Sequence, residues 1–266
     1  GKNTEATEFA KETLNIDALD HSAYYELYKL TGNGLDEMQA VMRGDNHNYI
    51  ELALSYMTAY LTEDAIEILK LAPNDNEPMV HYYLYALTNN KSELDKAENS
   101  DSLYCFPNRL EDITVLEKAI YNGGNYAAYY LGCLFYDKGR WEESKELWEK
   151  CADNIKLPTV YRNLSLVYYN KLKDGVLALK AMEKAFSIDK SDARIFFELD
   201  QLYKTLNFSL EKRLANMNEN SDLLEKRDDL YTEYITLLNM NGEYDNAYNR
   251  IMNHNFHPWE GGEGKI

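Results

Sequence analysis

The chain has 266 residues, and its balance of 45% hydrophobic and 27% charged residues is typical of a folded globular protein rather than a disordered one. Its 28 lysines and arginines against 45 aspartates and glutamates give a formal net charge of −17, which disfavours binding to nucleic acid or to an anionic membrane surface. The apolar runs are too short to span a bilayer, and 13 glycines with 5 prolines are few for a sandwich or barrel.

The first predicted element covers residues 4–20. The side chains that recur there at helical spacing are Ala6, Phe9, Ala10 and Thr13. We interpret this helix as the second member of a preceding helix pair. Further along, Asn46, Thr62 and Asp192 are suitable N-caps ahead of apolar-periodic segments, and Gly32-Asn33-Gly34 is expected to be a turn between helices.

The clearest repeating unit runs from Asn125 to about Leu157. Large side chains recur every three or four positions on two predicted helices, and a turn at Lys138-Gly139-Arg140 separates them. Small residues stand where the two helices must cross closely. The unit therefore indicates an antiparallel helix pair.

The same template recurs along the chain at constant offsets. Six matching residues lie 79 positions earlier, and they are Leu52, Ala53, Tyr56, Ala65, Leu69 and Ala72. Seven lie 103 positions later, and they are Tyr231, Tyr234, Leu238, Gly242, Tyr244, Ala247 and Ile251. The second helix alone recurs 34 positions later, at Ala178, Met182 and Ala185. Such matches at fixed offsets indicate a repeat array.

This spacing, with small residues at the helix crossing and a glycine turn between helices, resembles the tetratricopeptide repeat. The resemblance implies an all-α fold, a right-handed superhelical array of antiparallel helix pairs that together form an α-solenoid. Ser144 and Cys151 depart from the usual alanines, and an extra loop residue lies near Leu172-Lys173-Asp174. We expect irregular N-terminal repeats over residues 1–106, C-terminal tetratricopeptide-like repeats over 107–255, and a glycine-rich non-helical tail over 256–266.

The tail reads FHPWEGGEGK from Phe256 to Lys265, and its glycines and proline exclude a helix. A tryptophan in such a tail is expected to contact something. The favoured interpretation is that Trp259 and Phe256 cover the open end of the last helix pair, and the alternative is a role in ligand binding.

Several strings carry a second resemblance: FHPWEGGEGK, LDHSAYYEL, YRNLSL, FFELDQL and KRDDL. They resemble the helical C-terminal part of large bacterial tetratricopeptide-repeat proteins that carry an N-terminal β domain similar to sugar mutarotases. This resemblance implies a chain excised from a longer protein and an upstream domain as a partner. It brings no established reaction, only a link to carbohydrate.

In this type of repeat, the first helices of successive pairs line a concave face. The residues that we expect on this candidate groove or on the tail beside it are Arg162, Asn163, Arg194, Glu198, Asp200, Arg227, Asp228, Asp229, His257, Trp259, Glu260 and Glu263. For any single pair, the favoured interpretation is that Arg162 or Arg227 pairs with Glu198, Asp200 or Asp228 and fixes the angle between helices. As a group, arginines, carboxylates and an indole suit a sugar or a carboxylated peptide end.

The sequence predicts no catalytic residues, no cofactor and no metal site. His254 and His257 are three residues apart, but a proline follows and no cysteine is near, so exposed or capping roles are favoured. Cys105, Cys133 and Cys151 have no CxxC spacing, which indicates free thiols.

The favoured function is a non-catalytic scaffold whose groove binds a protein, a peptide or its own upstream domain. The alternative is an accessory half of a carbohydrate-processing enzyme, with the tail and groove shaping a sugar site. A purely structural oligomerisation array is a third hypothesis. The compartment is open, and the disulfide-free composition favours the cytoplasm over the periplasm.

Overall fold

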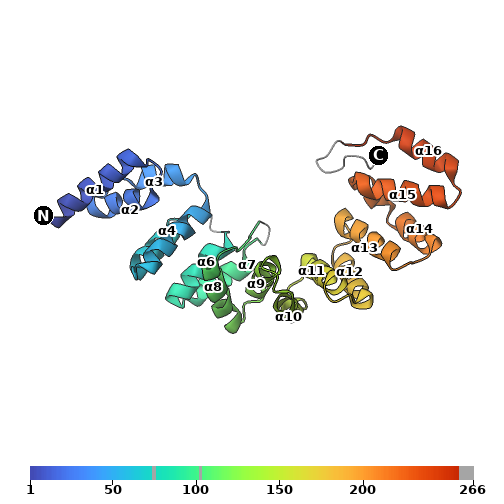
Figure 1. Cartoon of the computed structure of the whole chain (residues 1–266), viewed down its shortest axis with the longest axis horizontal. Coiled ribbons are helices and arrows are strands. Elements are labelled where there is room, and N and C mark those ends of the chain that lie inside the picture. Colours follow the sequence, from blue (N-terminus) through green and yellow to red (C-terminus); the bar gives the residue numbers. More distant parts are fainter. Residues whose placement is uncertain (74–75, 102–103, 258–266) are drawn as a thin grey trace. The chain divides into compact units, whose positions relative to one another are not determined.

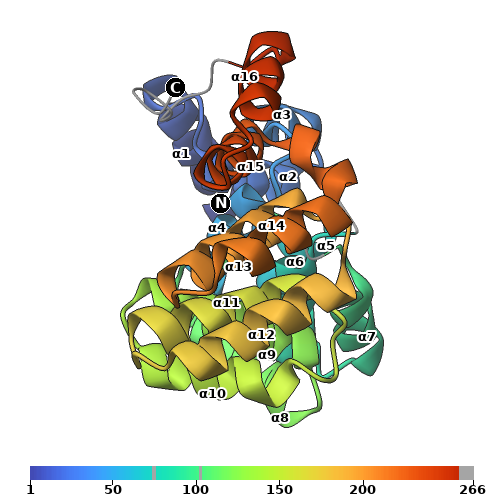
Figure 2. The ribbon, with the colours of Figure 1, turned by 90° about the vertical axis from the view of Figure 1, so that its right-hand side faces the viewer.

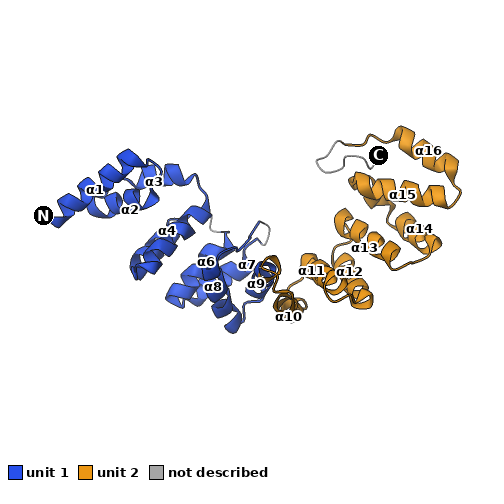
Figure 3. Cartoon of the chain, viewed as in Figure 1, with its two compact units in different colours: residues 1–134 blue, residues 135–266 orange. Residues whose placement is uncertain are grey.

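The computed structural model describes residues 1–73, 76–101 and 104–257, and it is built from helices. No strand occurs in these ranges, and no helix within them is long and apolar enough to cross a membrane. Contacts divide the chain into two compact units, Gly1–Leu134 and Phe135–Ile266, shown in two colours in Figure 3. The boundary between the units falls inside one helix.

The first unit consists of short helices in chain order (Figure 1). They are α1 (Lys2–Ile16), α2 (His21–Thr31), α3 (Leu35–Met42), α4 (Asn46–Thr58), α5 (Thr62–Lys70), α6 (Pro78–Thr88), α7 (Lys91–Asn99), α8 (Leu110–Tyr121) and the start of α9 (Asn125–Asp137). Sequence neighbours pack against each other from α1 to α3 and from α4 to α7, and α6 also packs against α8. The predicted boundary at residues 106 and 107 concerns repeat regularity, and the division into compact units falls elsewhere.

The second unit continues the same pattern. Its elements after the end of α9 are α10 (Trp141–Cys151), α11 (Pro158–Asn170), α12 (Gly175–Ile188), α13 (Ala193–Thr205), α14 (Leu210–Glu219), the short 3₁₀ helix η1 (Ser221–Lys226), α15 (Asp228–Met240) and α16 (Tyr244–Asn253). The paired helices α11 and α12 lie side by side in both ribbon views (Figures 1 and 2). The prediction of an all-α, tetratricopeptide-like array of helix pairs is confirmed.

Small residues lie buried at the helix crossings, as the repeat template requires. Ala65, Ala178 and Ala185 are all fully buried, and so is Ser144 at the position where alanine is usual. Within the α11–α12 pair, the Ser165 hydroxyl donates a 2.8 Å hydrogen bond to the carbonyl of Ala178. The paired helices therefore pack closely because the side chains between them are small. In the α11–α12 pair, a buried hydrogen bond also joins the two helices.

Two of the three predicted N-caps are shifted by one residue. Asp192 caps α13 as predicted, because its carboxylate accepts hydrogen bonds from two backbone amides of the first turn. Asn46 and Thr62 are instead the first residues of their helices. The cap of α4 is Asp45, whose carboxylate accepts from the amide of His47 at 2.9 Å. Neighbouring polar residues at a helix start compete for the cap, and the carboxylate occupies it here.

The predicted turn at Gly32-Asn33-Gly34 is present between α2 and α3. Gly34 has a φ of +107°, and a Cβ there would lie 3.2 Å from the carbonyl oxygen of Tyr24. Both its backbone conformation and the nearby α2 backbone therefore require glycine.

Tyrosine hydroxyls tie successive helices together. In the second unit, Tyr168 donates to Glu149 at 2.6 Å and Tyr203 donates to Glu183 at 2.9 Å, in each case linking a first helix to the second helix before it. The two carboxylates are one repeat length apart in the sequence. This linkage accounts for part of the abundance of tyrosine, which packs its ring while its hydroxyl reaches the helix surface.

Candidate functional site

The first cluster of candidate groove residues joins α11 to α13. Both oxygens of Glu198 accept hydrogen bonds from the Arg162 guanidinium, at 2.5 and 2.6 Å. Arg194, one turn before Glu198 on α13, approaches the same carboxylate at 3.3 Å. The predicted ion pair of Arg162 with Glu198 is thus present, and its two hydrogen bonds connect α11 to α13. Asn163 follows Arg162 on α11 and is half-buried.

Asp200 does not belong to an accessible groove, which corrects the prediction. Its side chain is fully buried, and both of its oxygens accept hydrogen bonds from Arg213 on α14, at 3.0 and 2.6 Å. Arg213 also donates to Glu233 on α15 at 2.7 Å, and Lys204 donates to Glu233 from α13. Asp200 therefore connects helices inside the unit, and no ligand approaching the surface can reach it.

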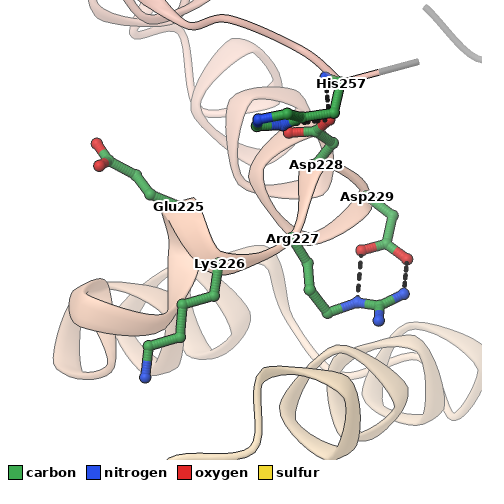
Figure 4. Close-up of a pocket in the computed structure, with 6 residues that line it drawn as sticks. All are labelled: Glu225, Lys226, Arg227, Asp228, Asp229 and His257. Atoms are coloured by element: carbon green, nitrogen blue, oxygen red, sulfur yellow. Dashed lines mark hydrogen bonds and ion pairs between the residues drawn. The ribbon is translucent and has the colours of Figure 1, made fainter. Parts of the chain in front are cut away.

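A second cluster lies at the start of α15, beside a surface hollow of about 280 Å³ (Figure 4). The residues that line it are Glu225, Lys226, Arg227, Asp228, Asp229 and His257. Arg227 was expected to pair with Glu198, Asp200 or Asp228, and this expectation is wrong. Its guanidinium instead donates two hydrogen bonds to Asp229, at 3.0 and 2.7 Å, because the two side chains leave the helix start in the same direction.

Asp228 holds the segment after α16 against the start of α15. Its two oxygens lie 3.0 Å from Nε2 of His254 and 2.5 Å from the backbone amide of His257. The His254 ring also stacks on Tyr231, with ring centroids 4.0 Å apart. The candidate residues Asp228 and His257 are thus brought together, and they anchor the chain just before the glycine-rich tail.

Asp228 gives this anchor a measurable pH dependence. Burial alone would raise the pKa of the carboxyl, but the hydrogen bonds from His254 and His257 outweigh it and hold the pKa below its ordinary value of 3.8. Such a group stabilises the fold fully above its unfolded pKa, and the contribution is lost as the pH falls through the lower folded pKa. We therefore expect Asp228→Asn to lower the melting temperature at neutral pH, with the gap from wild type closing below about pH 4.

Thermal melts of both proteins across this pH range check the prediction. Asp245→Asn is the matched control, because Asp245 is an exposed carboxylate on the neighbouring helix α16. A wild-type advantage of the same size at every pH would contradict a role for the ionised carboxylate.

The remaining candidates, Trp259, Glu260 and Glu263, lie outside the described residues. The prediction that the tail contributes to a binding site, and the interpretation that Trp259 covers the last helix pair, remain predictions. Phe256, which is described, lies edge-on to the His254 ring at a centroid distance of 4.7 Å.

The clusters consist mainly of arginine–carboxylate pairs. The groove carboxylates Glu198 and Asp229 each form an ion pair with an arginine, Arg162 and Arg227 respectively. The pKa of Arg227 is raised, first by its hydrogen bonds to Asp229, against the opposing effect of partial burial. Within the described ranges, no group of three or more metal-ligating side chains converges. The exposed arginine edges remain available to an anionic group.

Two features were missed by reasoning from the sequence. Arg213 was not singled out, although it is the buried arginine that neutralises Asp200. A hollow of about 630 Å³ lies over α11 and α12, with Leu164 and Ala181 in its floor and Lys180 and Lys184 among its lining. The only sequence signal for this hollow is a pair of lysines one turn apart on the outer side of α12.

Comparisons with known proteins address the fold. No family model matches the chain. Among solved structures, the chain is similar to PilF of Pseudomonas aeruginosa, with 19% identity and a TM-score of 0.44 over 83% of this chain and 91% of that one. It is also similar to MamA from Desulfovibrio magneticus RS-1, with 16% identity and a TM-score of 0.40 over 69% and 97% of the two chains.

A third similar structure is TTC0263 of Thermus thermophilus, which is described as a thermophilic tetratricopeptide repeat protein. It has 16% identity and a TM-score of 0.40 over 73% of this chain and 99% of that one. The tetratricopeptide-like architecture of the present chain is evident in its own helix pairs and their buried small residues.

Proposed function

We propose that the chain is a non-catalytic scaffold that binds a protein or peptide partner, with an upstream domain of the same polypeptide as one such partner. The proposed binding face is formed in the second unit by the first helices α11, α13 and α15. It is marked by the exposed part of the candidate groove, from Arg162 and Arg194 to Arg227 and Asp229.

The observation that carries this proposal is the exposed guanidinium of Arg194. Its side chain is 62% exposed, whereas the Glu198 carboxylate that it approaches is already held by two hydrogen bonds from Arg162. Two arginines thus share one carboxylate, and a positive charge remains at the surface of an acidic chain. An arginine in this state can bind a second carboxylate without first breaking a strong ion pair.

The partner expected from this chemistry is a peptide segment with a carboxylate, either an acidic side chain or a free C-terminus. The nearby Arg227 extends the positive edge, since Asp229 engages one face of its guanidinium. Because the pairs are partly exposed, each contact contributes modestly, and affinity has to come from several of them along the face.

Arg194→Ala is expected to weaken binding of acidic peptides about tenfold, equivalent to about 1.4 kcal/mol. The measurement is fluorescence anisotropy with a peptide library in which each acidic peptide has an amide-substituted twin. Arg140→Ala is the matched control, because Arg140 is also exposed and pairs with a carboxylate three residues away. Wild-type affinity in Arg194→Ala would refute the proposed face.

The alternative function is a carbohydrate site shared with an upstream domain. The same protein can be used to distinguish it from the scaffold. Thermal melts with a panel of oligosaccharides would show a raised melting temperature if the native chain bound a sugar. Stabilisation by sugars and not by acidic peptides would replace the scaffold proposal with the carbohydrate alternative. Oligosaccharide hydrolysis that Glu198→Gln abolishes would overturn the non-catalytic assignment.

A further inference from the structure

Three turns between helices of this chain contain an asparagine followed directly by a glycine. The dipeptides are Asn33-Gly34, Asn122-Gly123 and Asn241-Gly242, and all three asparagines are exposed. An asparagine in this position is prone to lose its side-chain amide, because glycine has no side chain to hinder attack by its own backbone nitrogen. The dipeptide is the same at all three sites, but its surroundings in the structure differ.

The glycine nitrogen is restrained in two of the three turns. The Gly123 amide donates to the carbonyl of Ile120 at 3.1 Å, and the Gly242 amide donates to the carbonyl of Asn239 at 3.1 Å. To reach the asparagine side chain, either nitrogen has to turn about the preceding backbone bond, and this rotation breaks its hydrogen bond. The backbone bond therefore adds to the barrier for attack.

The side-chain amides of these two asparagines are held as well. Nδ2 of Asn122 donates to the carbonyl of Lys118 at 2.8 Å, and Nδ2 of Asn241 donates to the Glu243 carboxylate at 3.0 Å. Each contact keeps the side chain against its own helix or turn. Reaction at either site thus requires the loss of two hydrogen bonds.

The turn between α2 and α3 lacks the backbone restraint. Among the described residues, the Gly34 amide donates no hydrogen bond. Nδ2 of Asn33 donates to the carbonyl of Thr31 at 3.3 Å, the longest of the three side-chain contacts. The Gly34 nitrogen can therefore turn toward the Asn33 side chain without breaking a bond of its own.

We propose that Asn33 is a site of spontaneous deamidation through a cyclic succinimide. The Gly34 nitrogen forms a bond to Cγ of Asn33, the bond from Cγ to Nδ2 breaks, and ammonia leaves with the proton of the Gly34 amide. Water then opens the ring at either of its carbonyl carbons. The products are aspartate and isoaspartate, and in isoaspartate the backbone runs through the former side chain.

Isoaspartate at this position is expected to loosen α3 from α2, because it lengthens the backbone of a tight turn. Gly34 lies close to α2, and a Cβ there would be 3.2 Å from the carbonyl oxygen of Tyr24. Helix α3, whose Met38 and Met42 are completely buried, packs against α2. A longer turn displaces the start of α3 and weakens this packing, whereas aspartate leaves the backbone length unchanged.

Peptide mapping of the full chain after incubation in mildly alkaline buffer tests the site. Deamidation of Asn33 should be at least about tenfold faster than that of Asn122 or Asn241, equivalent to about 1.4 kcal/mol in the barrier. In concentrated denaturant the three rates should converge, because the turns and their hydrogen bonds are lost. Equal rates in the folded chain, or the same order of rates in denaturant, would overturn the proposal.

Glu243→Ala separates the restraint on the glycine nitrogen from the restraint on the side chain. The substitution removes the acceptor of the Asn241 side-chain amide and leaves the hydrogen bond of the Gly242 amide in place. Asn241 should therefore remain slow in this variant. A rise to the rate of Asn33 would show that the backbone bond gives no protection, and the argument for Asn33 would fail.

Asn33→Asp separates the new charge from the longer backbone. The variant carries the carboxylate of the aspartate product on a normal backbone, so the turn between α2 and α3 should resist limited proteolysis like that of wild type. Chains with isoaspartate, purified from the incubated wild type, should be cleaved in this turn faster. Equal cleavage of the two would contradict the expected loosening of α3.

Discussion

Arg213→Met is expected to lower the free energy of unfolding of the second unit by about 3–5 kcal/mol. Arg213 lies 6% exposed between Asp200, which is completely buried, and Glu233, which is 13% exposed. Burial raises the pKa of Asp200 even with the arginine in place, so this carboxylate depends on its partner to stay ionised. Methionine fills the space of the arginine but leaves a buried carboxylate without hydrogen bonds.

Lys204→Met is the matched control, because Lys204 pairs with the same Glu233 but is 49% exposed. An exposed pair of this kind contributes at most about 1 kcal/mol. Denaturant unfolding followed by hydrogen exchange in α13 and α14 measures both variants. Adding Asp200→Asn to Arg213→Met should recover part of the loss, since it removes the unpaired charge. Equal losses in Arg213→Met and Lys204→Met would show that burial of the arginine is unimportant.

Asp200 also shows where reasoning from the sequence went wrong. Glu198 and Asp200 were both assigned to the groove, yet residues two apart on a helix point to nearly opposite sides. The structure places Glu198 against Arg162 and Asp200 against Arg213. The helix period therefore excludes placing both residues in the groove. The assignment considered the charge of the residues and not the side of the helix on which each one lies. The identity of the partner, Arg213 on another helix, depends on packing and was beyond local patterns.

The fold was predictable because repeats constrain it at many positions at once. The matches at fixed offsets include the small residues at the helix crossings, and Ala65, Ser144 and Ala178 are all completely buried there. The helix starts were less predictable, since Asp45 rather than Asn46 caps α4. The division near Leu134 was not predictable, because it depends on how contacts accumulate along the stack rather than on any residue pattern.

Glu98→Ala is expected to destabilise the first unit by about 2–4 kcal/mol. Glu98 lies at the end of α7, and its carboxylate accepts hydrogen bonds from the first three backbone amides of α9. Those amides, of Asn125, Tyr126 and Ala127, lie 2.8, 2.9 and 3.0 Å from its oxygens. A carboxylate at the start of a helix accepts hydrogen bonds from amides that have no partner within their own helix. It also interacts favourably with the positive end of the helix dipole.

The loss extends beyond the cap, because Glu98 also accepts a 2.6 Å hydrogen bond from the hydroxyl of Tyr82. Tyr82 is completely buried, and burial raises its pKa, so the hydroxyl remains a proton donor that needs an acceptor. Gly124 permits this arrangement, since a Cβ there would lie 3.0 Å from a Glu98 oxygen and from the carbonyl of Ala119. Gly124→Ala should therefore destabilise the same helix start, though less than Glu98→Ala.

Hydrogen exchange of the amides at the start of α9 gives the decisive readout. Glu98→Ala should remove protection at Tyr126 and Ala127, and Glu98→Gln should retain part of it because the amide oxygen can still accept one bond. Asp95→Ala is the matched control, an exposed carboxylate one turn earlier on α7. Unchanged protection in Glu98→Ala would mean that water satisfies the helix start equally well. The junction between α7 and α9 would then be held by apolar packing alone.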